Sequence, residues 1–179
     1  MKIDVALSDL FDLSKIDVNN NEIGFEASAQ ELGDVLDILK IPGLTRLKGV
    51  FKVRPWHKTG FMLNGHISAS VTQECVVTLE LVDEEVETDF ERSFLPPEEA
   101  AQLEPDEDVE VDFVLESEDP PDILEGTTIN LLAIISEHLA LGLEPYPRKE
   151  GAEIADSYQA SEEELANENP FAVLKRLKE

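Results

Sequence analysis

The middle of the chain alternates between apolar and polar residues. Residues 44–56 place basic side chains on even positions and apolar side chains on odd positions, namely Arg46, Lys48, Lys52 and Arg54 against Leu47, Phe51 and Val53. Residues 61–81 keep apolar side chains on odd positions: Phe61, Leu63, Ile67, Ala69, Val71, Cys75, Val77, Leu79 and Leu81. Residues 85–94 reverse the phase with Val86, Phe90 and Phe94. A two-residue period with one polar face predicts strands of an antiparallel sheet.

Shorter signals complete the predicted sheet. The sequence HKTG predicts a turn at residues 57–60, and residues 21–27 and 109–115 alternate like further strands. Few strands are as long as residues 61–81, so we expect a bend or bulge near Gly65 or Gln73, which interrupt the apolar face. Residues 96–108 are rich in proline and carboxylates and predict a loop.

Two segments predict helices. Ser28 is a candidate N-cap with Glu31 at the reciprocal capping position, followed by apolar residues at helical spacing up to Leu39. A second helix, residues 128–143, begins at Thr127 or Thr128 and is apolar almost all round, which predicts a buried position. Residues 150–167 are polar and acidic, as in a flexible linker, and the terminal residues 168–179 repeat apolar side chains at helical spacing.

Together these elements predict the α+β class. We expect one domain over residues 1–149, with a mostly antiparallel sheet, either open or barrel-like, two main helices and a short C-terminal helix. The start of the chain has no apolar run behind a basic end, so it does not predict a signal peptide. The longest apolar stretch, residues 129–143, is interrupted by Glu137 and His138 and is too short to span a bilayer. We therefore expect a cytoplasmic protein without membrane contact.

Charge divides this domain into two parts. The whole chain has 14 Lys and Arg against 40 Asp and Glu, a formal net charge of -26, which should repel nucleic acid and anionic membranes. Residues 40–73 nevertheless hold six basic residues and no acidic one, whereas residues 80–125 hold twenty acidic residues and one basic residue. We therefore distinguish a basic hairpin, about residues 44–72, from an acidic segment, about residues 80–125.

Cys75 is the single cysteine of the chain, so no internal disulfide forms. Three interpretations exist: a nucleophile, a metal ligand or core packing. A metal site needs several convergent ligands, and only His57, His66 and His138 accompany the cysteine, with His66 on the opposite strand face. The position of Cys75 among apolar residues favours packing, and the sequence predicts neither a metal nor another cofactor.

Three stretches in order resemble the YceD-like large ribosomal RNA subunit accumulation family of bacteria and plastids. They are LNGHISASVTQEC, INLLAIISEHLALGLEPYP and the C-terminal signature NPFAVLKRLK, which contains Asn169, Pro170, Phe171, Leu174 and Lys175. The sequence EPYPRK is similar to that of alphaproteobacterial members. Many members have a Cys-x-x-Cys pair where this chain has Cys75 and Thr78, so a metal or redox role of that pair does not transfer.

The resemblance implies a role in the synthesis, processing or stability of large-subunit ribosomal RNA, and it leaves the mechanism open. One hypothesis is that the basic hairpin binds this RNA or its precursor, with cations about 7 Å apart along one strand neutralising phosphates and Trp56 stacking on a base. The candidate residues are Arg46, Lys48, Lys52, Arg54, Trp56 and Lys58. The competing interpretation is a solvated strand face that blocks aggregation.

A second hypothesis assigns binding to the acidic segment. Ribosomal proteins are basic, so this segment suits an adaptor or chaperone that holds a ribosomal protein without touching RNA. The terminal residues 168–179 fit docking either on their own domain or in a partner's groove.

We expect no enzyme, because the sequence has no phosphate-binding glycine loop and no nucleophile–base pair at motif spacing. Clustered carboxylates such as Asp106 and Asp108 leave metal-dependent nuclease chemistry as the weakest alternative.

Overall fold

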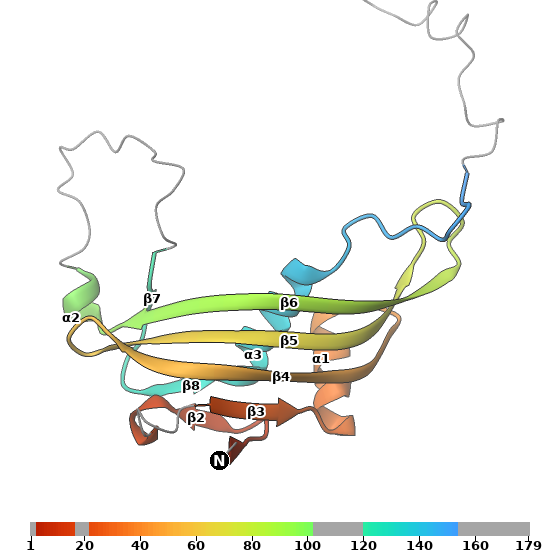
Figure 1. Cartoon of the computed structure of the whole chain (residues 1–179). Helices are drawn as coiled ribbons and strands as arrows, with labels where there is room; N and C mark the ends of the chain where they lie inside the picture. The colour runs from red at the N-terminus through yellow and green to blue at the C-terminus, as the bar shows by residue number, and fades with distance from the viewer. Residues whose placement is uncertain (1–2, 17–21, 102–119, 154–179) are drawn as a thin grey trace, which may run out of the picture.

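The computed structural model describes residues 3–16, 22–101 and 120–153. Figure 1 shows a large sheet with helices behind it. In chain order the elements are β1 (Ile3–Asp4), β2 (Leu10–Asp12), the 3-10 helix η1 (Leu13–Lys15), β3 (Glu22–Glu26), α1 (Ala29–Leu39), β4 (Gly43–Trp56), β5 (Gly60–Glu74), β6 (Leu81–Leu95), α2 (Pro97–Ala100), β7 (Asp122–Ile123), β8 (Thr128–Asn130) and α3 (Leu131–Gly142).

The large sheet has the strand order β1-β3-β4-β5-β6-β7. Its centre consists of the three long antiparallel strands β4, β5 and β6, and the short strands β1 and β7 add parallel pairs at the two ends. The α+β class and the mostly antiparallel sheet are confirmed. The barrel-like alternative is not supported, because β1 and β7 do not pair with each other and the sheet stays open over the described residues.

One face of this sheet is covered and builds the core; we call it the inner face. It carries the odd-numbered apolar residues of β4 and β5 and the even-numbered ones of β6, as the alternation predicts. Helices α1 and α3 and the small β2–β8 pair lie behind it in Figure 1. Buried core residues from strands and helices include Phe51, Leu63, Ile67, Val35, Ile135 and Leu139. The opposite face, the outer face, holds the polar side chains.

The predicted strand at residues 61–81 ends earlier than expected. Strand β5 stops at Glu74, and residues 75–80 turn the chain back into β6. Leu79 N–H donates to the Cys75 carbonyl at 2.9 Å, and Cys75 N–H donates to the Glu80 carbonyl at 2.8 Å. Leu79 and Leu81, predicted on the apolar face, are 69% and 63% exposed. The prediction failed because apolar residues also occupy odd positions within the turn, so the alternation does not show where the strand ends.

The second predicted helix begins later than its pattern indicates. Residues Thr128–Asn130 form β8, which pairs with β2, and α3 starts at Leu131. The Asn130 side chain accepts a hydrogen bond from Ala133 N–H at 3.1 Å and so caps the helix. The expected acidic loop also contains α2, a single helical turn at Pro97–Ala100.

The expected irregularity lies in a different strand. The β5–β6 ladder pairs Phe61 with Phe94 through Glu74 with Leu81 without a shift, whereas β4 shifts its register against β5 between Leu44 and Arg46. Gly65 marks no bulge. A Cβ atom there would lie 2.5 Å from the Phe90 ring and 2.7 Å from Phe51 Cβ, so this glycine makes room for two aromatic residues.

Several predictions fall outside the described residues. These are the strand at 109–115, Asp106 and Asp108, the linker from residue 154 onward, and the C-terminal signature with Asn169, Pro170, Phe171, Leu174 and Lys175. Across the described ranges, none of the helices combines the length and apolarity needed to cross a bilayer.

Candidate binding surface: the outer face of the sheet

Strand β4 presents a row of four basic side chains on the outer face. Arg46, Lys48, Lys52 and Arg54 are all exposed, while Leu47, Phe51 and Val53 between them enter the core. Side chains on one face of a strand repeat every two residues, so Arg46 and Lys48 lie about 7 Å apart, and so do Lys52 and Arg54. We call these four residues the basic row. The structure brings them together as the alternation predicts.

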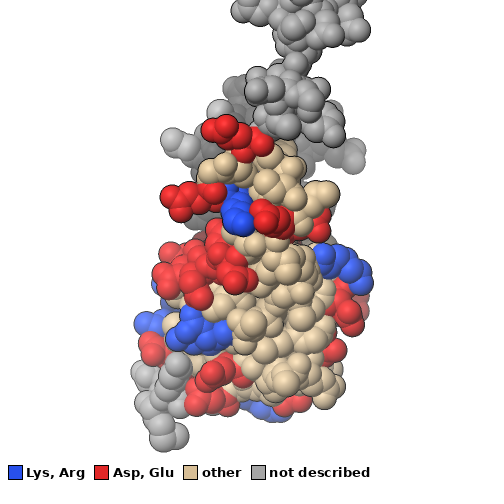
Figure 2. All heavy atoms as spheres, turned by 90° about the vertical axis from the view of Figure 1, so that its right-hand side faces the viewer, with Lys and Arg blue, Asp and Glu red and all other residues tan. Residues whose placement is uncertain are grey.

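The sheet register sets a row of carboxylates parallel to the basic row. Strand β5 lies between them and contributes mostly uncharged polar side chains, such as Ser68 and Ser70. Strand β6 then directs five carboxylates to the outer face, at every second residue: Asp83, Glu85, Glu87, Asp89 and Glu91. We call these the acidic row. In Figure 2, which looks along the sheet from one end, carboxylates border basic side chains on the left of the molecule.

The other neighbour of β4 is acidic as well. Strand β3 pairs Glu22 with Lys52 and Glu26 with Lys48. Lys52 Nζ lies 3.4 Å from the Glu22 carboxylate in a half-exposed ion pair. The basic row therefore has carboxylates on both sides, seven in all against four cations.

Arg46 reaches across β5 to the acidic row. Its guanidinium lies 2.7 Å from the Glu85 carboxylate, which also accepts a hydrogen bond from Ser70 Oγ at 2.6 Å. The Ser70 hydroxyl, followed by Arg46, lowers the pKa of Glu85 from its ordinary value. This carboxylate stays ionised, and the Arg46 charge is already partnered.

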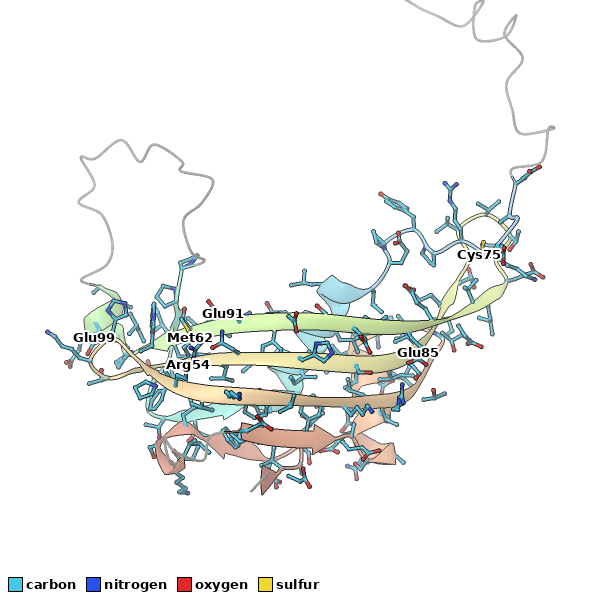
Figure 3. All side chains as sticks on the ribbon, viewed as in Figure 1. Arg54, Met62, Cys75, Glu85, Glu91 and Glu99 are labelled. Carbon is cyan, nitrogen blue, oxygen red and sulfur yellow. The ribbon has the colours of Figure 1, made fainter. Side chains whose placement is uncertain are left out.

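A similar bridge forms near the β4–β5 turn. Arg54 Nε donates to Asn64 Oδ1 at 3.2 Å, and the Asn64 amide donates in turn to Glu91. Figure 3 labels Arg54 and Glu91 at this end of the sheet and Glu85 toward the other end. Between the two bridges, His66 Nδ1 lies 2.8 Å from Asp89, whose side chain is 90% exposed.

Trp56 and Lys58 lie at the end of the basic row. Trp56 closes β4 and is half-buried, and its ring meets His57 edge-on at a centroid distance of 4.2 Å. Lys58 is exposed within the turn, and Thr59 Oγ1 donates to Glu99 of α2 at 2.6 Å. The turn at residues 57–60 is confirmed, and α2 places a carboxylate beside it.

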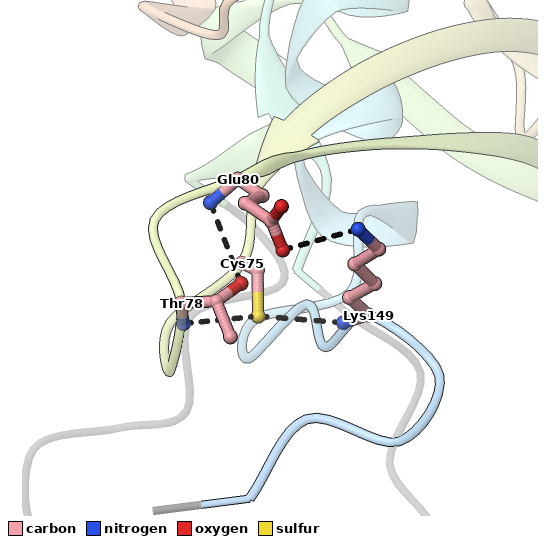
Figure 4. Close-up of polar contacts among 4 residues, drawn as sticks. All are labelled: Cys75, Thr78, Glu80 and Lys149. Carbon is pink, nitrogen blue, oxygen red and sulfur yellow. Dashed lines mark hydrogen bonds and ion pairs between the residues drawn. The ribbon is translucent and has the colours of Figure 1, made fainter.

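Cys75 is fully buried at the far end of the sheet, outside the main core cluster. Its Sγ accepts hydrogen bonds from Thr78 N–H at 3.4 Å and from Lys149 N–H at 3.3 Å. These contacts, shown in Figure 4, connect the 75–80 turn to the segment after α3, as does the ion pair of Lys149 with Glu80 at 3.1 Å. Hydrogen bonds, that of Thr78 first, lower the pKa of the thiol to about 6. The sulfur thus acts as an acceptor that holds two chain segments together.

The described residues contain no group of three or more His, Cys, Asp or Glu side chains that would hold a metal ion. His57, His66 and Cys75 lie on different parts of the sheet, and His138 stacks on Phe90 with a centroid distance of 5.0 Å. The structure therefore does not assemble the four residues considered as ligands.

The acidic row is the part of the surface that sequence reasoning did not place. The sequence separated a basic hairpin from an acidic segment, and the ladder between β5 and β6 sets them side by side instead. The signal was present in the alternation of carboxylates with Val86 and Phe90, which puts every second residue of this strand on the polar face.

A family model described as "Large ribosomal RNA subunit accumulation protein YceD" matches residues 63–178. The chain belongs to the YceD family. The match begins within β5 and contains β6 and α3, whereas β4 with the basic row precedes it. The family name suggests a role in the accumulation of large-subunit ribosomal RNA, and thereby in ribosome biogenesis. No curated protein and no solved structure matches the chain.

Proposed function

We propose that this protein supports large-subunit ribosomal RNA accumulation as a non-catalytic binding factor in the cytoplasm, and that its acidic row binds a basic protein such as a ribosomal protein. The observation that carries this proposal is the regular placement of five carboxylates along β6, on the outer face of the sheet. An extended acidic surface attracts a basic protein, and complementary charge favours that partner over acidic ones.

The charge balance of the outer face supports a protein partner over RNA. Neighbouring strands lie about 4.8 Å apart, so the acidic row is roughly 10 Å from the basic row. That separation is comparable to the Debye length at physiological ionic strength, about 8 Å. A phosphate approaching Lys48 therefore also meets the field of Glu26 and Glu87, while Arg46 and Lys52 already have carboxylate partners.

Direct RNA contact is the second candidate, and the basic row itself favours it. Its four cations are exposed as two pairs on one face of β4, and Trp56 ends the same strand. If RNA phosphates replaced the carboxylates that now pair with Arg46 and Lys52, all four cations would contact the RNA. In this case, binding would fall steeply with salt, because each neutralised phosphate releases counterions.

Two variants of the full chain separate these candidates. The first, the β6 variant, carries Glu85→Gln, Glu87→Gln and Asp89→Asn; the second, the β4 variant, carries Arg46, Lys48, Lys52 and Arg54 each changed to Ala. Binding is measured over a salt series against proteins extracted from purified large ribosomal subunits and against large-subunit ribosomal RNA fragments. Circular dichroism and thermal unfolding establish that each variant remains folded.

We expect the native chain to bind basic ribosomal proteins, and the β6 variant to lose affinity and salt dependence. The β4 variant should bind them at least as well, because it removes competing cations. If the native chain instead binds the RNA and only the β4 variant loses that binding, the RNA contact is right and the protein-binding proposal is wrong. Binding to neither probe would contradict both mechanisms.

A further inference from the structure

Strand β6 combines the acidic row with a long edge that no strand of the described residues covers. The strand has 15 residues, and all of its ladder with β5 lies on one side. On its other side Phe94 and Leu95 pair with β7. Among the described residues, no strand pairs with this side of β6 between Leu81 and Ser93. Figure 1 shows β6 bordering the sheet along most of its length.

The main chain of the acidic row points toward this edge. Leu124 N–H donates to the Leu95 carbonyl at 2.9 Å from the β7 side, whereas Glu80 accepts from Cys75 on the β5 side. Main-chain groups alternate direction from one residue to the next in a strand. The odd-numbered residues of β6 therefore direct N–H and C=O to the open edge. These are the residues that carry the five carboxylates.

Side chains of β6 anchor the edge to the core and to α3. Val86 and Phe90 project from the same strand into the core and are 4% and 6% exposed. His138 of α3 stacks on the Phe90 ring, and Arg92 connects the strand to α3 through an ion pair with Glu137 at 2.9 Å. A partner that pairs with β6 would thus meet an already ordered template, which lowers the entropic cost of binding.

We propose that the open edge of β6 binds an extended, basic protein segment by strand addition. Rows of main-chain donors and acceptors would give affinity, and Lys or Arg at every second position of the incoming segment would face the acidic row. This inference rests on the proposed binding of a basic protein and adds the conformation and sequence pattern of the bound segment.

Charge argues against two other occupants of the edge. A second copy paired edge to edge would set carboxylates opposite carboxylates, which is destabilising. RNA would be repelled by the same row. Charged side chains also protect edge strands from aggregation, so the competing explanation is an edge that binds nothing.

The first experiment uses peptides of about nine residues, the length of β6 from Asp83 to Glu91 that carries the acidic row. One peptide alternates lysine and threonine. The matched control has the same sequence with N-methyl groups on alternate residues, which keeps the charge and removes the donors of one strand edge. A third peptide has the same composition with its lysines in one block. Binding to the full chain is measured at several salt concentrations.

We expect the alternating peptide to bind at least tenfold more tightly than the control methylated on the residues that face β6, because several hydrogen bonds are lost. Equal affinity and equal salt dependence of all three peptides would overturn strand addition and leave the acidic surface as a charge-only binder, so the proposed function would stand. If no lysine peptide binds even at low salt, the proposed protein-binding function fails as well.

A pair of variants tests the edge from the protein's side. Glu87→Gln and Glu87→Pro both remove one carboxylate, but only the proline also removes an N–H that faces the open edge, with no ladder bond to β5 lost. Relative to Glu87→Gln, the proline variant should bind the alternating peptide about fivefold to tenfold more weakly. Equal binding by the two folded variants would contradict strand addition. If the proline variant does not fold, the comparison of the three peptides remains the test of strand addition.

Amide hydrogen exchange of the free, monomeric full chain tests whether the edge is open. Odd-numbered amides from Asp83 to Glu91 should exchange fast and even-numbered ones slowly, because only the latter face β5. The alternating peptide should then protect the odd-numbered amides. Protection of both sets before the peptide is added would show that another part of the chain covers the edge, and would overturn the inference. If the odd-numbered amides are protected because the chain dimerises, the edge binds a second copy, and the inference is likewise overturned.

Discussion

Glu31 is a carboxylate that the fold buries almost completely, with 4% of the residue exposed. It accepts hydrogen bonds at 2.8 Å from Ser28 N–H, Ser28 Oγ and Ser8 N–H. Burial alone would raise its pKa, but the hydrogen bonds from Ser28 and Ser8 outweigh burial and lower the pKa to about 2. Glu31 thus completes the capping box of α1 and also fixes the N-terminal segment against that helix.

We predict that Glu31→Gln lowers the free energy of unfolding by about 1–3 kcal/mol at neutral pH, because the ionised acceptor of buried N–H groups is lost. The folded-state pKa lies below that of the unfolded chain, so this stabilisation is complete above about pH 5 and disappears as pH falls toward 2. Urea unfolding at pH 7 and pH 3 should show a narrower gap between variant and wild type at the lower pH.

Asp37→Asn is the matched control, since Asp37 is exposed on the same helix, and it should change stability by less than about 0.5 kcal/mol. A gap that stays constant with pH would mean that the charge of Glu31 contributes nothing. The sequence predicted the contact with Ser28, because the two residues are three positions apart. It did not indicate Ser8, which is 23 residues away.

At the scale of elements, the three long strands pack around a glycine. Gly65 sits in the middle of β5, opposite Phe90 of β6 and Phe51 of β4. The sequence shows Gly65 as an interruption of an apolar row. The ladder explains the interruption, because the two neighbouring strands fill the space above the glycine with aromatic rings.

Gly65→Ala should lower the free energy of unfolding by about 1–3 kcal/mol, because the added methyl group collides with both aromatic side chains in a packed interior. Gly33→Ala in α1 is the control: nothing lies within 4 Å of its Cβ position, and alanine is the better helix former, so stability should rise by about 0.5–1 kcal/mol. Chemical denaturation of both variants measures the difference. A neutral Gly65→Ala would show that the sheet relaxes around the methyl group.

Element types and element ends differed in how well the sequence predicted them. Strands β4 and β6 and helix α1 follow from periods of two and 3.6 residues, because burial on one side imposes those periods. The end of β5 at Glu74 and the start of α3 at Leu131 were missed. Both depend on contacts distant in sequence: Val76 N–H bonds to the Pro147 carbonyl, and β8 pairs with β2.

At the scale of the whole molecule, repulsion among carboxylates opposes folding. The net charge of -26 greatly exceeds what the ion pairs on the outer face compensate. Salt screens this repulsion. It also screens the exposed ion pairs, but exposed ion pairs contribute little to the free energy of unfolding. The balance therefore favours stabilisation by salt.

We predict that the melting temperature rises by on the order of 2–4 °C between low and high concentrations of sodium chloride, the shift that about 1 kcal/mol produces in a domain of this size. Thermal unfolding followed by circular dichroism gives the value. The β6 variant, with three carboxylates neutralised, should show a smaller rise. A fall in melting temperature with salt would mean that the outer-face ion pairs outweigh the repulsion.

The sequence by itself determined the α+β class, the faces of the long strands, the cap of α1, the two opposite charge blocks and the family resemblance. These are local in the chain, since periodicity, capping and composition need only neighbouring residues. Only the tertiary structure decided that the sheet stays open over the described residues, that Cys75 joins two distant segments, and that the acidic row lies two strands from the basic row. Those features depend on which strands pair and in what register, and strand pairing is set by packing of the whole chain.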